Sequence, residues 1–251
     1  DTYKQIKSDL NKKFSIVFIG TPCQIAGILC YFHYRPENLI LVDILCHGVS
    51  SLDCFLCGIK LETKKEVSSI SFRNGNQYCL KGYDNGRNCI FKTPYRASYW
   101  LNGFVEGYIF RENCYSCKYA SKDRYGDITI GDFWGLKNDY DINKGVNFVA
   151  INSDKGIQLW NKINKSLNFE ERELEEAILH NHPLKEPAHK PVNYDKFCKI
   201  YNDSGGAKAL IKAYPNKTLF IWLRRIVRKN KMLYRIVTEI PLLGKKLKDH
   251  S

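Results

Sequence analysis

The stretch VFIGTPCQIAG, residues 17 to 27, decides the fold of this chain. It joins an apolar run typical of a strand buried on both faces, FSIVFIG (14–20), to a segment with helical spacing, TPCQIAGILCYF (21–32). A glycine-threonine-proline junction is a common way for a strand to pass into a helix beside a bound phosphate. The unusual residue is Cys23, which the pattern places in the first turn of the helix.

The same order of strand and helix then repeats. NLILVDIL (38–45) predicts a second buried strand, and LDCFLCGIKLETKK (52–65) predicts a second helix. Two successive units of this kind favour a parallel, right-handed βαβ arrangement. Because parallel strands end at the same edge of a sheet, we expect Cys23 and Cys46 to lie at the edge where such sheets bind ligands.

The remaining segments add antiparallel strands and helices. Further strands are predicted at VSSISFRNG (67–75), QYCLKGYD (77–84), RNCIFKTP (87–94), GDITIGDFWG (126–135) and VNFVAIN (146–152). The second and third of these meet at Asn85-Gly86, which is typical of a tight hairpin. The expected fold class is therefore α/β, with a mostly parallel sheet built from βαβ units, an antiparallel hairpin excursion and a helical C-terminal extension.

The composition of the chain limits the class of protein and the cellular compartment that we expect. The 251 residues are 44% hydrophobic and 26% charged, which suits a folded domain, and no run is long enough to span a bilayer. The chain begins without methionine and has no signal-peptide pattern, so we expect a fragment of a longer protein. Ten cysteines in such a chain favour metal-binding or catalytic thiols in the reducing cytosol over disulfides.

The net charge of +13 belongs mainly to the end of the chain. Residues 216–251 carry ten Lys or Arg against Glu239 and Asp249, interleaved with large apolar residues. This pattern predicts a basic amphipathic helical tail, in contact with anionic lipid at the inner face of the membrane, with a partner, or packed as an ordinary surface helix. The apolar residues disfavour nucleic acid as the ligand.

The segment ENCYSCKY places Cys114 and Cys117 two residues apart, a spacing that lets both thiolates bind one metal ion or cluster. Two further ligands are needed, and Cys23 and Cys46 are the cysteines whose expected positions converge. The alternative is that these two are small buried residues. Zinc ribbons normally use two such pairs, so dispersed ligands favour an iron-sulfur cluster over zinc.

Two other residues lie beside this expected site. His47 follows Cys46, and three roles are open besides that of a hydrogen-bonded loop residue: ligand, hydrogen-bond donor to a cluster sulfur, or proton shuttle. Asp132 lies in the glycine-bounded turn GDFWG, which can receive the edge of a flavin or nucleotide. Phe133 and Trp134 of this turn are expected to fill the core.

The other cysteines are expected to pack. Cys54 and Cys57 share one face of a predicted helix, where burial is the favoured role. Cys79 and Cys89 flank the hairpin, where they can face each other across it, and we expect them to be packing residues.

Taken in order, GTPCQIAG, VDILCHGVSS, SISFRNG, CYSCKYA and DITIGDFWG resemble the C-terminal domain of the coenzyme F420 hydrogenase/dehydrogenase beta-subunit family, in particular bacterial members encoded with polysaccharide-synthesis functions. The resemblance runs from about Phe14 to about Lys165. It implies a flavoprotein with FAD and a 4Fe-4S cluster, whose ligands would be Cys23, Cys46, Cys114 and Cys117. It also makes Gly20, Thr21 and Gln24 candidates for flavin contacts, beside His47 and Asp132.

The resemblance also divides the chain. Residues 1–165 would be the iron-sulfur flavoprotein domain, 166–215 a peripheral helical extension and 216–251 the basic tail. Full-length relatives carry a ferredoxin-like segment and a flavin-binding half before this domain, and neither is present in this sequence. FAD binding is therefore expected to depend on that missing half.

The expected function is that of an oxidoreductase domain that relays electrons between the cluster, FAD and an organic acceptor, either F420 or another compound, in surface polysaccharide biosynthesis. A redox partner or ferredoxin-like segment would exchange electrons with it in the cytoplasm. The alternative function is a zinc-stabilised or cofactor-free accessory module for glycan assembly at the membrane.

Overall fold

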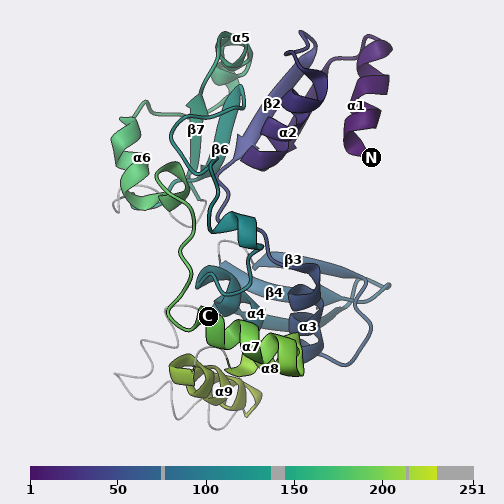
Figure 1. The fold of residues 1–251 in the computed structure, drawn as a ribbon, viewed down its shortest axis with the longest axis vertical. Coiled ribbons are helices and arrows are strands. Elements are labelled where there is room, and N and C mark those ends of the chain that lie inside the picture. The colour runs from purple at the N-terminus through teal and green to yellow at the C-terminus, as the bar shows by residue number, and fades with distance from the viewer. Residues whose placement is uncertain (75–76, 137–144, 213–214, 231–251) are drawn as a thin grey trace. The chain divides into compact units, whose positions relative to one another are not determined.

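The chain divides into two compact units, each built from two stretches of sequence. The computed structural model describes residues 1–74, 77–136, 145–212 and 215–230 (Figure 1). The parallel-sheet unit comprises residues 1–47 and 113–188 with their gap, and the antiparallel-sheet unit comprises residues 48–112 and the described residues from 189 onward.

The parallel-sheet unit holds a four-stranded sheet in the order β1-β2-β6-β7. Its elements are α1 (Thr2–Asn11), β1 (Ile16–Gly20), α2 (Pro22–Phe32), β2 (Leu39–Ile44), β6 (Ile128–Asp132), β7 (Asn147–Ile151), α5 (Asp154–Ile163), the 3₁₀ turn η3 (Asn164–Ser166), α6 (Leu174–His180) and the 3₁₀ turn η4 (His182–Leu184). Strands β1, β2 and β6 are parallel, and β7 is antiparallel to β6. The prediction of a mostly parallel sheet with a βαβ start is confirmed.

The antiparallel-sheet unit holds the order β3-β4-β5. Its elements are α3 (Leu52–Glu62), β3 (Ser69–Asn74), β4 (Gln77–Tyr83), β5 (Cys89–Pro94), the 3₁₀ turn η1 (Tyr95–Ala97), α4 (Tyr99–Val105), α7 (Tyr194–Ser204), α8 (Gly206–Lys212) and α9 (Pro215–Lys229). A further 3₁₀ turn, η2 (Glu112–Cys114), lies where the two units join in the sequence. The core of the antiparallel-sheet unit packs Leu80, Trp100, Phe197 and Leu210. The antiparallel excursion is confirmed as a separate sheet.

Cys79 and Cys89 do not face each other across the hairpin of β4 and β5. The register pairs Cys79 with Pro94 and Cys89 with Tyr83, with a shift between Gly82 and Tyr83. The shift in register moves them out of opposition. The prediction that both are packing residues is confirmed for Cys79, which is buried, and wrong for Cys89, which is exposed.

The two faces of the parallel sheet are covered unequally. On one face, Ile25 and Ile28 of α2 pack with Ile6 of α1 against Leu39 and Leu41 of β2, and all five side chains are buried. This packing holds α2, and therefore the Cys23 turn, against the sheet.

The other face is lined by β-branched residues. The register aligns Ile19, Val42, Ile128 and Ile151 in one row across the four strands. The row is buried at its centre, whereas Ile19 and Ile151 at its ends are exposed. The sheet is thus covered by helices of this unit mainly on the α2 side.

The C-terminal tail starts as a helix, as predicted. Helix α9 confirms a helical start to the tail expected at 216–251, while residues 231–251 lie outside the described part of the chain. The compact units interleave in sequence, whereas the predicted domains 1–165 and 166–215 are contiguous, so those boundaries stay predictions. Within the described ranges, every helix is too short or too polar to cross a bilayer.

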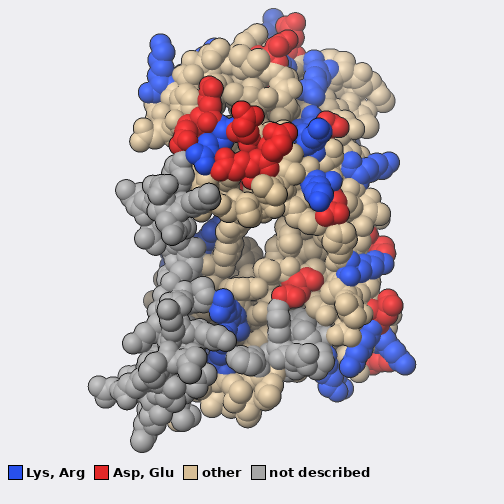
Figure 2. Space-filling view, turned by 90° about the vertical axis from the view of Figure 1, so that its left-hand side faces the viewer, with Lys and Arg blue, Asp and Glu red and all other residues tan. Residues whose placement is uncertain are grey.

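Acidic side chains gather on the face of the parallel-sheet unit that carries α6 (Figure 2). They come from the segment before α6 and from its first turn: Glu170, Glu171, Glu173, Glu175 and Glu176. Arg172 pairs with Glu170 and Glu176 within this cluster.

Gly156 in the first turn of α5 is required by the fold. A Cβ atom at this position would overlap the backbone oxygen of Asp127. We expect Gly156→Ala to lower the free energy of unfolding by about 1–3 kcal/mol through this overlap, measured by urea denaturation.

Gly27→Ala in α2 is the matched control. Its Cβ would meet the hydroxyl of Tyr3, the far end of a side chain that can turn away, at 2.8 Å. The change in unfolding free energy should stay within about 1 kcal/mol, since alanine favours the helix. Equal losses in the two variants would contradict this account.

Candidate functional site

Three parallel strands end at one edge of the sheet. The register pairs Gly20 at the end of β1 with Asp43, and Ile44 at the end of β2 with Ile130 of β6. Cys23 therefore follows β1, Cys46 follows β2 and Asp132 ends β6 at the same carboxyl edge. The expectation that Cys23 and Cys46 follow strands at a common edge is met by this register.

The turn that carries Cys23 is held by its neighbours. The backbone N–H of Thr21 donates to Oε1 of Gln24 at 2.9 Å, and the hydroxyl of Tyr3 donates to the backbone oxygen of Gln24 at 2.8 Å. The Thr21 hydroxyl lies 3.1 Å from Sγ of Cys23. Cys23 is exposed in the first turn of α2.

The CxxC segment forms a loop, as predicted. Cys114 ends the 3₁₀ turn η2, and the N–H of Ala120 donates to the backbone oxygen of Cys117 at 3.3 Å. Both thiols are partly exposed, as is that of Cys46. These three cysteines and Cys23 all belong to the parallel-sheet unit.

One buried ion pair ties this loop to the end of β2. The Arg124 guanidinium donates to Oδ1 of Asp43 from Nε at 3.0 Å and from Nη2 at 2.5 Å, and both side chains are almost fully buried. Nη1 of Arg124 also donates to the backbone oxygens of Tyr119 and Ser121, each at 3.2 Å. Nη2 reaches the backbone oxygen of Ile44, two residues before Cys46. The pair thus fixes residues 119–124, which follow the CxxC motif, beside the exit of β2.

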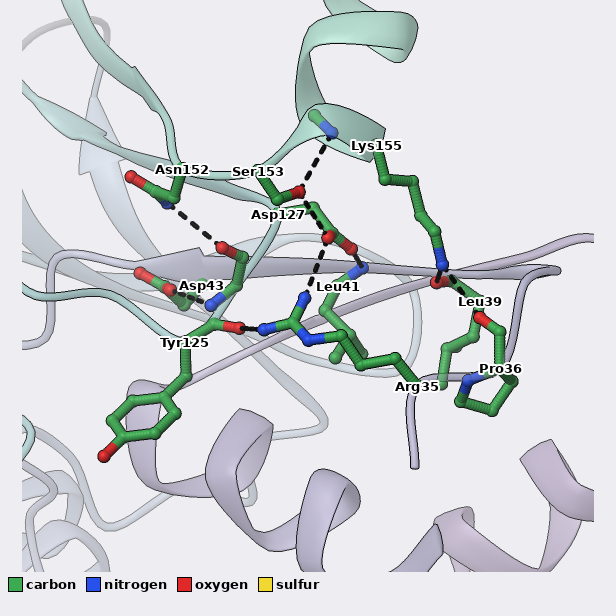
Figure 3. A network of polar contacts seen from close by, with 12 residues as sticks. Arg35, Pro36, Leu39, Leu41, Asp43, Tyr125, Asp127, Asn152, Ser153 and Lys155 are labelled. Carbon is green, nitrogen blue, oxygen red and sulfur yellow. Dashed lines mark hydrogen bonds and ion pairs between the residues drawn. The ribbon is translucent and has the colours of Figure 1, made fainter. Parts of the chain in front are cut away.

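A second network holds the start of β6 (Figure 3). The Asp127 carboxylate accepts hydrogen bonds from the N–H of Leu41 at 2.8 Å, from Arg35 at 2.9 Å and from the Ser153 hydroxyl at 2.7 Å. Asn152 donates to Oγ1 of Thr129 at 2.9 Å. Asp127 lies at the end of β6 opposite Asp132, so this network aligns the strands and does not face the carboxyl edge.

The GDFWG turn is only partly core. Phe133 packs against Phe148 with ring centroids 6.0 Å apart, whereas the Trp134 side chain is 47% exposed. The prediction that both aromatic residues fill the core is wrong for Trp134, because the chain leaves the sheet at this point. Gly135 adopts a φ of +84°, and the ring of His180 packs where a Cβ would lie. The exposed indole of Trp134 therefore lies two residues after Asp132, the last residue of β6.

The four candidate cysteines are not arranged as a closed zinc site. A tetrahedral zinc ion with Zn–S bonds of about 2.3 Å draws its sulfur atoms to within about 4 Å of one another. Among the described residues, which include all ten cysteines, no three cysteine sulfurs lie within 4.8 Å of one another.

Cysteines of the antiparallel-sheet unit have a different environment. Cys54 lies in the core, and burial raises the pKa of its thiol. Cys57 packs against the same core and lies on the same helix, α3. The prediction that these two residues pack is confirmed, and a thiol kept protonated is a poor metal ligand.

Sequence reasoning missed the residues that position the site. Arg124 and Asp43 were not singled out, although an aspartate within the apolar run NLILVDIL was a usable signal. A carboxylate in a strand buried on both faces requires a partner. The sequence did not identify that partner, since Arg124 lies 81 residues away.

The fold and its edge define a class: an α/β domain whose parallel strands present thiols and polar turns at one edge, as cofactor-binding domains do. The family model that describes the C terminus of the coenzyme F420 hydrogenase/dehydrogenase beta subunit matches residues 14–177. The chain belongs to this family, which places it in the context of an oxidoreductase.

A solved structure gives a more distant likeness. The chain is similar to one in the F420-reducing [NiFe] hydrogenase complex from Methanosarcina barkeri, with 16% identity and a TM-score of 0.39. The comparison covers 79% of this chain and 60% of that chain, so the chain spans less than two thirds of that relative. No curated protein matches.

Arg124→Gln tests the buried pair. Removing one partner leaves the Asp43 carboxylate buried without its cation, so we expect the unfolding free energy to fall by about 3–5 kcal/mol in urea denaturation. The released loop should also be cut faster by trypsin, at Lys118 and Lys122, under native conditions.

Arg35→Gln is the control, since its side chain is 43% exposed and Asp127 keeps two other donors. We expect a loss of about 1 kcal/mol or less and unchanged cleavage of the 118–122 loop. If both variants lost the same stability and were cut alike, the special role of Arg124 would be refuted.

Proposed function

We propose that this chain is the iron-sulfur part of a flavoprotein oxidoreductase, with Cys23, Cys46, Cys114 and Cys117 as ligands of a 4Fe-4S cluster. The observation that carries the proposal is the tie made by Arg124, which bonds the segment just after the CxxC motif to the end of β2, two residues before Cys46. Family membership supports the same reaction class.

Each thiol has a reason to serve as a ligand. Cys23 lies at a helix N-terminus, with the Thr21 hydroxyl 3.1 Å from its sulfur. A hydrogen bond from this hydroxyl would stabilise a thiolate and tune the potential of a bound cluster. Cys46, Cys114 and Cys117 lie on loops whose thiols are partly exposed, so a cluster can reach them. Ten cysteines in a chain of this length suit a reducing compartment, and we propose that the domain acts in the cytoplasm.

For FAD we propose the same carboxyl edge. Gly20 ends β1 at this edge, and the N-terminal N–H groups of α2, ordered by Thr21 and Gln24, suit a phosphate group. His47 and Asp132 provide polar contacts at the ends of β2 and β6. When bound, the two cofactors supply one-electron transfer and hydride exchange with an organic acceptor such as F420.

We propose that the chain acts within a longer protein or complex. It spans 60% of the hydrogenase chain to which it is similar. A flavin-binding half and a ferredoxin-like segment or redox partner would complete the electron path. The likeness of its motifs to bacterial members encoded with polysaccharide-synthesis functions supports a role in surface polysaccharide biosynthesis.

Anaerobic reconstitution with iron and sulfide tests the ligand set. The parent chain should take up iron and sulfide and gain the broad visible absorbance of an iron-sulfur cluster. The variants Cys23→Ser, Cys46→Ser, Cys114→Ser and Cys117→Ser should each lose most of that iron, because serine is a weaker ligand for the cluster.

Cys30→Ser is the matched control, because Cys30 is exposed on the same helix as Cys23. This variant should bind as much iron as the parent. The cluster proposal is refuted if the parent chain gains no absorbance and the variants Cys23→Ser and Cys114→Ser behave like the parent. Stoichiometric zinc without iron in protein purified without oxygen would instead support a zinc-stabilised accessory module for glycan assembly.

A further inference from the structure

Helix α9 is fixed to the antiparallel-sheet unit by one of its faces. Ile221 is only 2% exposed and belongs to the core of that unit. Arg225, one turn further on, donates to Glu62 at 3.1 Å and to the backbone oxygens of Ala97 and Leu61 at 3.3 and 2.8 Å. The Glu62 side chain is 1% exposed, so the ion pair is largely buried. These contacts determine which side of the helix faces outward.

The outward side of α9 is apolar. Leu219, Trp222, Leu223 and Ile226 follow the i, i+3, i+4, i+7 spacing of one helix face, and they are 59%, 52%, 43% and 37% exposed. A surface helix normally presents polar residues opposite its buried face. We call these four residues the apolar stripe.

The apolar stripe borders a groove with basic residues around it. The groove, of about 740 Å³, is lined by Leu219 and Trp222 together with Ile200 and Ile211. Three exposed lysines also line it, Lys196 of α7 and Lys208 and Lys212 of α8. Asp203 is the acidic residue among the lining residues.

The sequence around the apolar stripe is positively charged, like the three lysines of the groove. Helix α9 contains five basic residues and no acidic residue: Lys217, Arg224, Arg225, Arg228 and Lys229. Residues 216–251 as a whole carry ten basic residues against two acidic ones. The surface therefore combines exposed apolar side chains with positive charge.

We propose that the apolar stripe and the three lysines bind the surface of an anionic lipid membrane. The helix would lie in the plane of the interface, with the stripe at the boundary between headgroups and acyl chains and the lysines at lipid phosphates. A second copy of the chain would bring like charges together, and a nucleic acid offers no apolar layer for the stripe. The proposal does not depend on the cluster or the flavin.

Flotation of the whole chain with lipid vesicles tests the proposal. We expect binding to vesicles that contain roughly one third phosphatidylglycerol and much weaker binding to vesicles of phosphatidylcholine alone. Trp222→Ser and Leu223→Ser should each lower the partition coefficient about tenfold, since each removes a large apolar side chain from the interface. Both side chains are exposed, so folding should persist, as judged by circular dichroism.

The lysines are tested separately. Replacement of Lys196, Lys208 and Lys212 by Gln should weaken binding to the anionic vesicles by about fivefold per residue and make it less sensitive to added salt. The matched controls are Lys199→Gln, an exposed position of α7 outside the groove, and Val192→Ser, a fully exposed apolar residue of the same unit. Both should bind like the parent.

Three outcomes would overturn the proposal. The first is no binding to the anionic vesicles, and the second is equal loss of binding in the controls and the stripe variants. The third is a dimer, detected by light scattering, that Trp222→Ser dissociates in a chain that does not float with vesicles. That result would assign the stripe to contact between copies.

Discussion

The ion pair between Arg124 and Asp43 is the constraint on which the arrangement of the parallel-sheet unit depends. Burying both charges costs several kcal/mol, and the cost is offset only if the remaining hydrogen-bonding groups are satisfied. Here the guanidinium also binds three backbone oxygens, and the second carboxylate oxygen accepts the N–H of Gly126 at 2.9 Å. Because Arg124 and Gly126 are both bonded to Asp43, few other positions of residues 119–126 satisfy these groups.

The topology of the sheet explains why one edge collects the candidate residues and one face stays partly open. Strands β1, β2 and β6 are parallel neighbours in this order, and the connection from β1 to β2 runs through α2. Helices α1 and α2 cover one face of the sheet. On the opposite face, Ile19 and Ile151 are exposed. The same parallel order brings three strand ends to one edge, where thiols and polar turns accumulate.

The sequence predicted what depends on local patterns and missed what depends on distant partners. Apolar β-branched runs indicated the strands, and the Gly-Thr-Pro junction indicated the start of α2, because burial and capping act within a few residues. The Asp43 partner and the Cys79 register depend on tertiary packing over many residues. The interleaved units have the same origin, since β2 and β6 are neighbours separated in sequence by much of the second unit.

The same residue types have different roles in the two units because their surroundings differ. In the antiparallel-sheet unit, burial raises the pKa of Cys54, so its thiol behaves as an apolar group. In the parallel-sheet unit, Cys23 and Cys46 follow strands β1 and β2, Cys114 and Cys117 lie on a loop, and all four thiols are at least partly exposed. Amphipathic helices differ likewise: α2 buries its apolar face against a sheet, whereas α9 is anchored through Ile221 and Arg225 and exposes its apolar stripe. The environment of a motif, more than the motif, therefore determines its chemistry in this chain.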